Sequence, residues 1–228
     1  MKKILFIHGM FHNPDIFNPL EEELKDYCKC VKYEIAGLDD NKQVTVSYLT
    51  ELLSVHLSYS KYDLIVAHSF GAYLVLNTLR SCEDTKILLF NPLYSNLNAF
   101  MRKRLKLLKL TGLAQKFGKV GIFKKGLLRL ARYTCNDTEL IDDKLISGIF
   151  TCNASCVYRL LMETMERIPI KCRGQVYMIW GSKDRILDCP RATTGYCKEI
   201  INILCGHTSF LENKEFAVSK IKDLIGVN

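Results

Sequence analysis

The chain has 228 residues, of which 48% are hydrophobic and 25% are charged. This length suits one α/β domain with a core on both sides of a sheet, and this composition excludes an intrinsically disordered chain. The sequence contains no apolar run of about 18 residues or more, so we expect no membrane-spanning helix. The apolar run Ile4 to Ile7 stops at His8 and is too short for a secretion signal, so we expect a cytoplasmic protein.

Ten cysteines raise the question of disulfides or a zinc site. The only close pairs are Cys28-x-Cys30 and Cys152-x3-Cys156, and neither has the Cys-x2-Cys spacing of zinc ligands. A chain of this length also has no need of disulfides to stabilise its core. We therefore expect free, mostly buried thiols, and neither a metal nor any other cofactor.

The formal net charge of +8 is unevenly distributed along the chain. Residues 85–136 contain twelve Lys or Arg residues and no Asp or Glu, which leaves the rest of the chain at −4, since 8 − 12 = −4. The basic character therefore belongs to one segment, and this segment requires its own explanation.

Short apolar runs that end at Gly, Asn-Pro or a polar residue indicate strands, and residues at helical spacing lie between them. In chain order, we expect a strand at Lys3–His8, a helix at Asp15–Tyr27, a strand at Cys30–Ile35, a helix at Val44–Leu57, a strand at Tyr62–His68, a helix at Phe70–Arg80 and a strand at Thr85–Phe90. From Asn98 to Ile168 only helical periodicities occur, and after them come strands at Gln175–Trp180 and Glu199–Leu204 and a closing helix at Glu212–Ile225.

Strands that alternate with helices favour a mostly parallel central sheet of about six strands, with helices on both faces. In such sheets, chemistry collects at the carboxyl ends of the strands. Four of the expected strand ends carry reactive residue types, namely His8, Ser69, Asp184 and His207.

Ser69 stands in Ala67-His68-Ser69-Phe70-Gly71, between an expected strand and an expected helix. The small residues on either side of Ser69, Ala67 and Gly71, permit a sharp, strained turn that exposes the serine hydroxyl. The N-terminus of the following helix favours negative charge nearby. The usual form of such a turn is Gly-x-Ser-x-Gly, and here Ala67 replaces the first glycine. Taken alone, the motif also fits a serine helix cap without chemistry.

A nucleophilic serine requires a histidine base, and a third group must hold that base in the correct tautomer. His207 follows the last expected strand and Asp184 follows the one before it, so the order along the chain is Ser, Asp, His. We assign Ser69 as nucleophile, His207 as base and Asp184 as the acid that orients it. Asp188 is the one rival for the acid.

Two backbone N–H groups are candidates for stabilising the oxyanion of an acyl-transfer reaction. One belongs to Phe70, which follows the nucleophile directly, and the other to Met10, in the loop after the first strand. We expect His8 to brace this loop. The side chain of His68 is expected to point away from the site.

The His8-Gly9 loop, the motif around Ser69, Gly181-Ser-Lys-Asp184 and Gly206-His207 resemble the α/β-hydrolase superfamily across essentially the whole chain. More narrowly, the chain is similar to small bacterial esterases and thioesterases with a helical lid. This resemblance implies an α/β-hydrolase core at residues 1–97 and 169–228, and a helical lid at residues 98–168.

The sequence departs from the family pattern in two ways. It begins at the strand that leads into His8-Gly9, without the usual leading hairpin, and its serine motif begins with Ala67. Neither departure affects the three assigned residues. Ser69 excludes the nucleophilic Asp of the dehalogenase branch.

The resemblance and the assigned residues together predict a serine hydrolase that cleaves a carboxylic ester or thioester through an acyl-enzyme. Two rival functions use the same features: a lyase or synthase in which the base removes a proton and no acyl-enzyme forms, and a non-catalytic protein that binds a partner or membrane through the basic segment.

The Lys and Arg side chains at the start of the expected lid, called the lid cations below, suggest an anionic group on the substrate or partner. The candidates are an acyl-carrier protein, a coenzyme-A thioester or an anionic membrane surface. The alternative is that these side chains only solvate the outer face of lid helices. Nucleic acid is not expected, because no recognition motif accompanies the charge. The residues proposed for this contact are Arg102, Lys103, Arg104 and Lys106.

Overall fold

The computed structural model of the chain describes residues 1–10, 12–35, 44–78, 85–94, 97, 99, 102–103, 105, 109–110, 153–165, 175–189 and 197–227. Within these residues, six strands form one sheet in the order β2-β1-β3-β4-β5-β6, and each neighbouring pair is parallel. The strands are β1 (Lys2–Ile7), β2 (Cys28–Tyr33), β3 (Leu64–His68), β4 (Lys86–Phe90), β5 (Gln175–Gly181) and β6 (Cys197–Ile203). The predicted parallel sheet of about six strands is therefore confirmed.

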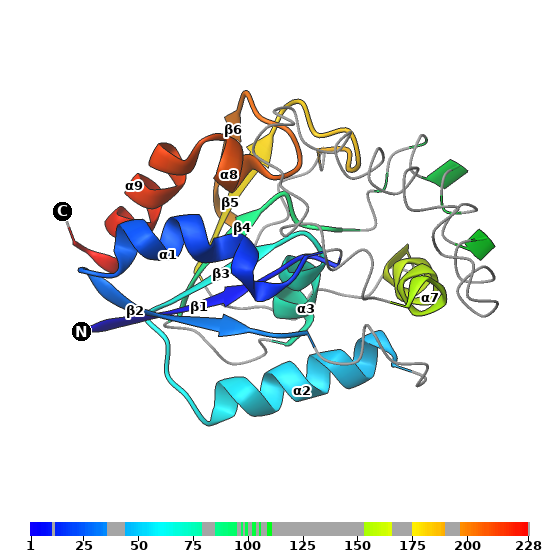
Figure 1. Ribbon diagram of the computed structural model, residues 1–228, viewed down its shortest axis with the longest axis horizontal. Helices are drawn as coiled ribbons and strands as arrows, with labels where there is room; N and C mark the ends of the chain where they lie inside the picture. The colour runs from blue at the N-terminus through cyan, green and yellow to red at the C-terminus, as the bar shows by residue number, and fades with distance from the viewer. Residues whose placement is uncertain are drawn as a thin grey trace.

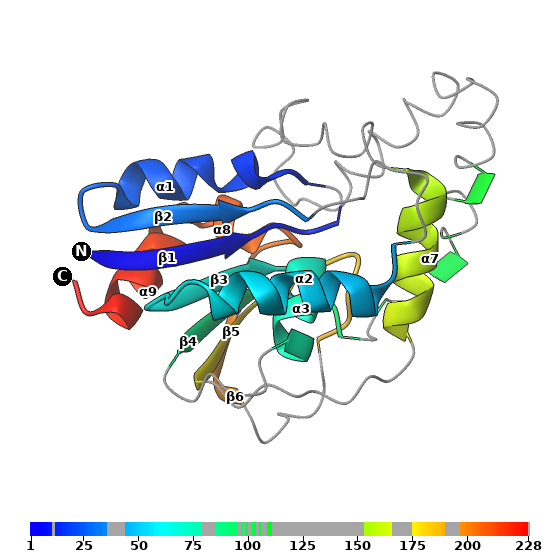
Figure 2. The same ribbon diagram turned by 90° about the horizontal axis from the view of Figure 1, so that it is seen from below.

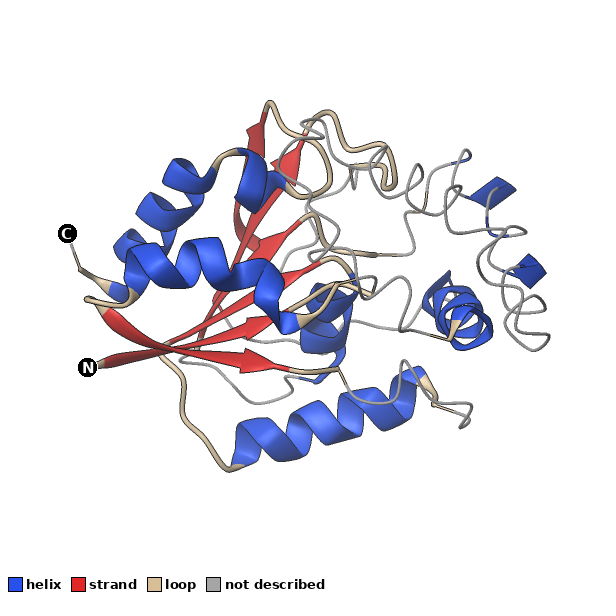
Figure 3. Ribbon diagram, in the orientation of Figure 1, coloured by secondary structure: helices blue, strands red, loops and turns tan. Residues whose placement is uncertain are grey.

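Helices cover both faces of this sheet, as the alternation of strands and helices predicts (Figures 1 and 3). The helical elements in the described residues are the 3-10 helix η1 (Pro14–Phe17), α1 (Asn18–Leu24), α2 (Val46–Ser58), α3 (Phe70–Thr78), α7 (Ala154–Met165), α8 (Ser209–Glu212) and α9 (Lys214–Ile225). Along β1, Ile4 and Phe6 pack on one face with α1, α8 and α9, whereas Leu5 and Ile7 pack on the other with α2, α3 and α7. None of the helices in the described part of the chain has the length and apolar character needed to cross a membrane.

The strand order reverses direction at β1, which lies between β2 and β3. The chain leaves β1 toward β2 on one side, and returns through α2 to β3 on the other side (Figure 2). The loops that follow β1 and β3 therefore part at the carboxyl edge of the sheet, and such a switch point is where open α/β sheets bind ligands. Ser69 follows β3 directly at this point.

Two expected helices are each divided in the structure. The helix expected at Asp15–Tyr27 consists of η1 and the shorter α1, each with a proline in its first turn. The helix expected at Glu212–Ile225 consists of α8 and α9, which are separated at Asn213. The backbone of Asn213 is not helical, and its side chain accepts the N–H of Phe216 as an N-cap.

Of the predicted lid, residues 98–168, the longest described stretch is α7 with the preceding Asn153. Val157 and Leu160 of α7 are fully buried in the core that also contains α2 and α3. Glu163 accepts the N–H of Val46 at 2.8 Å, and Arg159 donates to the carbonyl of Val44 at 2.9 Å. These contacts join α7 to the start of α2. Most of the predicted lid lies outside the described residues.

Six of the ten cysteines fall within the described residues, and all six are free thiols. Cys28, Cys156 and Cys205 are buried, and Cys189 is exposed. Within the described residues, this agrees with the expectation of free thiols.

Candidate active site

Ser69 lies on a sharp turn between β3 and α3, and its φ of 51° is in the left-handed region. A non-glycine residue in this region stores about 1–3 kcal/mol of strain, which the surrounding structure must hold. Here three backbone hydrogen bonds hold it. Ser69 donates its N–H to Phe90 at 3.1 Å, and its carbonyl accepts from Leu93 and Tyr73 at 3.1 and 3.2 Å. The strained turn predicted from the motif is thus confirmed.

The turn packs directly against the end of β1, and two glycines permit this approach. A β-carbon at Gly71 would lie 2.4 Å from the carbonyl oxygen of His8 and 2.7 Å from that of Ile7. A β-carbon at Gly9 would lie 3.3 Å from the β-carbon of Ser69. The loop after β1 is therefore held beside the serine.

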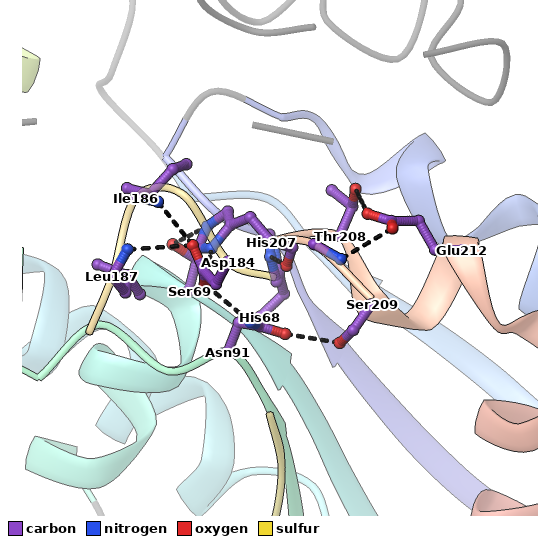
Figure 4. A network of polar contacts seen from close by, with 11 residues as sticks. His68, Ser69, Asn91, Asp184, Ile186, Leu187, His207, Thr208, Ser209 and Glu212 are labelled. Carbon is purple, nitrogen blue, oxygen red and sulfur yellow. Dashed lines mark hydrogen bonds and ion pairs between the residues drawn. The ribbon is translucent and has the colours of Figure 1, made fainter. Parts of the chain in front are cut away.

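The structure brings together the three residues assigned from the sequence, each from the end of a different strand (Figure 4). The Nε2 atom of His207 lies 3.0 Å from the hydroxyl oxygen of Ser69, and its Nδ1 atom lies 2.8 Å from Oδ2 of Asp184. A carboxylate only accepts hydrogen bonds, so Nδ1 carries the proton and Nε2 presents its lone pair to the serine hydroxyl.

Asp184 is held as an oriented, buried carboxylate, with only 1% of its side chain exposed. Its Oδ1 accepts the N–H groups of Ile186 and Leu187 at 2.7 and 3.0 Å, and its Oδ2 accepts from Asn91 and His207, each at 2.8 Å. Burial by itself raises the pKa of this carboxyl. The interaction with His207 and the hydrogen bonds from His207, Ile186 and Leu187 outweigh burial, and they lower the pKa below its usual value.

Asp188, the rival acid, is exposed at the surface. The hydrogen bond to Nδ1 of His207 is made by Asp184, four residues earlier in the chain. The geometry therefore favours Asp184 as the residue that orients His207.

The two candidate oxyanion donors lie on the elements that meet at Ser69. Phe70 is the first residue of α3 and is fully buried, and Met10 follows Gly9 in the loop after β1. The N-terminus of α3 contributes partial positive charge beside the serine. The roles of the two N–H groups remain predictions.

His8 uses both ring nitrogens to brace the loop after β1. Its Nδ1 donates to the carbonyl of Gly9 at 2.7 Å, and its Nε2 accepts the N–H of Ile35 at 3.2 Å. Burial lowers the pKa of His8 to about 4, against the partial compensation of the hydrogen bond to Gly9. His8 is therefore neutral near pH 7, in keeping with the bracing role expected from the sequence.

His68 differs from its expectation, because its side chain contacts the site. Its Nε2 donates to the carbonyl oxygen of His207 at 3.0 Å, and the two rings lie 4.8 Å apart between centroids. The ring of His12 lies 5.4 Å from that of His68. Burial first, and then the proximity of His207, lower the pKa of His68 well below its usual value and that of His12 to about 3.

Further residues that the sequence analysis did not assign hold the segment around His207. Glu212 accepts hydrogen bonds from the N–H of Gly206 at 2.8 Å and from the hydroxyl of Thr208 at 3.4 Å (Figure 4). It therefore holds the residue before His207 and the residue after it. Ser209 donates to Oδ1 of Asn91 at 2.6 Å. The sequence carried no signal for these contacts beyond the closeness of Thr208, Ser209 and Glu212 to His207.

Of the four lid cations, the structure describes Arg102 and Lys103, and both are exposed. Arg102 donates from Nε to the carbonyl of Leu97 at 2.7 Å. Arg104 and Lys106 lie outside the described residues. Among the described residues, no group of three or more His, Cys, Asp or Glu side chains is placed to hold a metal ion.

Solved structures with the same fold cover almost all of the chain. A thermophilic esterase from Thermogutta terrifontis is 16% identical, with a TM-score of 0.71 over 98% of this chain and 89% of that one. An esterase from Exiguobacterium antarcticum is 11% identical, with a TM-score of 0.74 over 99% and 92%. An epoxide hydrolase from Bacillus megaterium is 14% identical, with a TM-score of 0.70 over 99% and 94%.

Comparison at the level of sequence gives the family. No curated protein matches the chain. The family model of the alpha/beta hydrolase family matches residues 4–218, which is nearly the whole sequence. The chain therefore belongs to the alpha/beta hydrolase family.

Proposed function

We propose that the chain is a serine hydrolase that cleaves a carboxylic ester or thioester through an acyl-enzyme on Ser69. The observation that carries this proposal is the unbroken hydrogen-bonded path from the Ser69 hydroxyl through His207 to Asp184. Membership of the alpha/beta hydrolase family supports the reaction class. The esterases among the structures with the same fold are consistent with it.

In the first half of the reaction, Ser69 attacks the carbonyl carbon while Nε2 of His207 takes the hydroxyl proton. The negative charge on the carbonyl oxygen then faces the N–H groups proposed for Phe70 and Met10. Asp184 stabilises the imidazolium that forms. His207 gives the proton to the leaving alcohol or thiol, and the acyl group remains as an ester on Ser69.

In the second half, His207 removes a proton from a water molecule, which attacks the acyl-enzyme carbonyl carbon. The tetrahedral intermediate collapses, and the proton passes from His207 to the oxygen of Ser69. This step releases a carboxylic acid and restores the enzyme. Each half begins with His207 as a neutral ring whose proton is on Nδ1, and the hydrogen bond from Nδ1 to Asp184 selects this tautomer.

The apolar face of α7 packs against segments that carry the site. Val157, Leu160 and Leu161 of α7 share one buried cluster with Met10 and Leu187. Met10 neighbours Gly9, which packs against Ser69, and Leu187 donates its N–H to Asp184. We propose that the acyl chain of the substrate lies beside this apolar junction, where each methylene group that it buries would contribute about 0.8 kcal/mol.

Fluorophosphonate labelling of the purified protein tests this function, alongside a panel of p-nitrophenyl esters and acyl thioesters. We expect stoichiometric labelling and turnover in the wild type, and loss of both in Ser69→Ala. The turnover should fall on the order of 10⁴-fold or more. Ser58→Ala is the matched control, because Ser58 is exposed and its hydroxyl donates to the carbonyl of Val55 in its own helix.

The other outcomes of this experiment point to the rival functions. Labelling of Ser69 without turnover of any ester or thioester would favour a lyase or synthase that uses the same residues. A folded protein that neither labels nor turns over a substrate would contradict the proposal and favour a binding protein.

The finer prediction of an anionic carrier or head group has a separate test. Arg102 and Lys103 are exposed, so their attraction for an anionic substrate is screened over about 10 Å at 0.1 M salt. We expect a carrier-bound thioester to be hydrolysed faster than its free analogue at low salt, and this preference to fall at high salt and in Arg102→Ala/Lys103→Ala. Equal rates under both salt conditions would exclude this role for the lid cations.

A further inference from the structure

Asn91 belongs to the polar network around the three assigned residues, although it is not one of them (Figure 4). It follows β4, it is fully buried, and its φ of 43° lies in the left-handed region. Asparagine tolerates this region better than most residues, and such strain concentrates at functional sites. Its N–H donates to the carbonyl of Ile179 in β5 at 3.0 Å.

The two ends of the Asn91 amide are assigned by their partners. The carboxylate of Asp184 can only accept, so Nδ2 faces Oδ2 of Asp184 at 2.8 Å as donor. The hydroxyl of Ser209 then donates to Oδ1 at 2.6 Å. The amide therefore links the acid after β5 to the helix that begins two residues after His207.

The position of Asn91 is chemically specific, because its Nδ2 shares one oxygen atom with the base. Nδ1 of His207 and Nδ2 of Asn91 both donate to Oδ2 of Asp184, each at 2.8 Å. With the N–H groups of Ile186 and Leu187 on Oδ1, the carboxylate accepts four hydrogen bonds. Asn91 is thus one of the four donors that orient the carboxylate, and it is the one that shares Oδ2 with His207.

We propose that Asn91 is a positioning residue for the reaction: a neutral donor that fixes Oδ2 of Asp184 toward His207 and ties both to the segment carrying the base. This inference rests on the proposed function. A neutral amide suits the position, because it donates to the carboxylate without adding charge. A carboxyl group of the same shape could donate only while protonated.

The test measures the rate constant for fluorophosphonate labelling from about pH 6 to pH 9 in the wild type and four variants. Asn91→Ala removes the donor at every pH, and we expect labelling about 10- to 100-fold slower throughout, because a small misplacement of a reacting group has this effect. Ser209→Ala frees only one end of the amide and should give a smaller loss in the same direction.

Asn91→Asp gives the readout that a merely structural role would not produce. At low pH its new carboxyl is protonated, donates to Asp184 and supports labelling close to the wild-type rate. As the pH rises, that proton leaves and two carboxylates face each other. The deficit relative to the wild type should therefore grow with pH. Within the part of the chain that the structure describes, the titratable groups beside this pair are His207, which bonds to Asp184, and His68 of β3, which bonds to the carbonyl of His207.

Asn77→Ala is the matched control, since Asn77 is a buried asparagine of α3 whose Nδ2 donates to the carbonyl of Tyr73. It should lower the free energy of unfolding without changing the labelling profile.

Wild-type rates in Asn91→Ala, or a deficit in Asn91→Asp that does not vary with pH, would overturn the inference while leaving the proposed function intact. Should Asn91→Ala not fold, the profile of Asn91→Asp decides alone. A wild-type protein that does not label would contradict the proposed function itself, and this inference with it.

Discussion

Asp184 and Asp188 stand four residues apart, and the fold places them in opposite environments. Asp184 is buried and accepts a hydrogen bond from Nδ1 of His207, whereas Asp188 is exposed. An isolated carboxylate is expensive to bury, so the four hydrogen bonds that Asp184 accepts are the condition for its burial. From the sequence, the strand end favoured Asp184 and left Asp188 as a rival.

A comparison of two amide variants tests this distinction. Asp184→Asn replaces an acceptor by an amide that no longer stabilises the imidazolium or the productive tautomer, and we expect labelling and turnover to fall on the order of 10⁴-fold. Asp188→Asn should react at nearly the wild-type rate. A large loss in Asp188→Asn with little change in Asp184→Asn would reverse the assignment.

At the scale of elements, α7 is attached to the start of α2 by side chain to backbone contacts. Glu163 accepts the N–H of Val46, the first residue of α2, and its carboxylate also faces the positive end of that helix. Such a contact satisfies one of the N–H groups that lack a partner within the helix. Val157 and Leu160 supply the apolar part of the same junction.

We expect Glu163→Ala to lower the free energy of unfolding by about 1 kcal/mol, and Glu163→Gln to lower it by less, because the amide oxygen still accepts. Hydrogen exchange followed by mass spectrometry should show faster exchange in α7 and the first turn of α2, with the sheet unchanged. Glu51→Ala, on the exposed side of α2, is the control. Equal acceleration in the strands and in α7 would mean that the contact is not local.

At the scale of the whole molecule, the site edge contains three histidines that are held neutral. The pKa of His8 is lowered from 6.5 to about 4 and that of His12 from 6.5 to about 3, in both cases chiefly by burial, and the pKa of His68 is also lowered. Below about pH 6.5 the unfolded chain binds protons that the native state does not, so stability falls as the pH falls toward the folded values.

Between about pH 7.5 and pH 5.5, His8 and His12 should each lower the free energy of unfolding by about 1 kcal/mol, and His68 should lower it further in the same direction. Urea unfolding at the two pH values measures this change. The lowered pKa of Asp184 acts only below its unfolded value near 3.8, outside this interval. His12→Asn should reduce the pH dependence by one histidine's share, and an unchanged dependence would show that His12 is not held neutral.

Much of the fold followed from local sequence patterns. The apolar runs at Ile4–Ile7 and Leu64–Ala67 predicted strands buried on both faces, because a parallel sheet covered by helices admits few polar side chains. The bounds of β2 were less predictable. The strand was expected at Cys30–Ile35, but it spans Cys28–Tyr33, and Cys28 pairs in register with Lys2 of β1. Strand bounds depend on such pairing, which a run of residues does not contain.

The sequence by itself determined the order of Ser69, Asp184 and His207 and their places at strand ends, because parallel strands bring their carboxyl ends to one edge. Only the tertiary structure decided which side chains surround them. Asn91 looked like the stop of a strand, and His68 was expected to point away. Asn91 is separated by 93 residues from its partner Asp184, and His68 by 139 residues from its partner His207. Contacts between residues so far apart arise from the packing of strand ends, and no local pattern of residues encodes them.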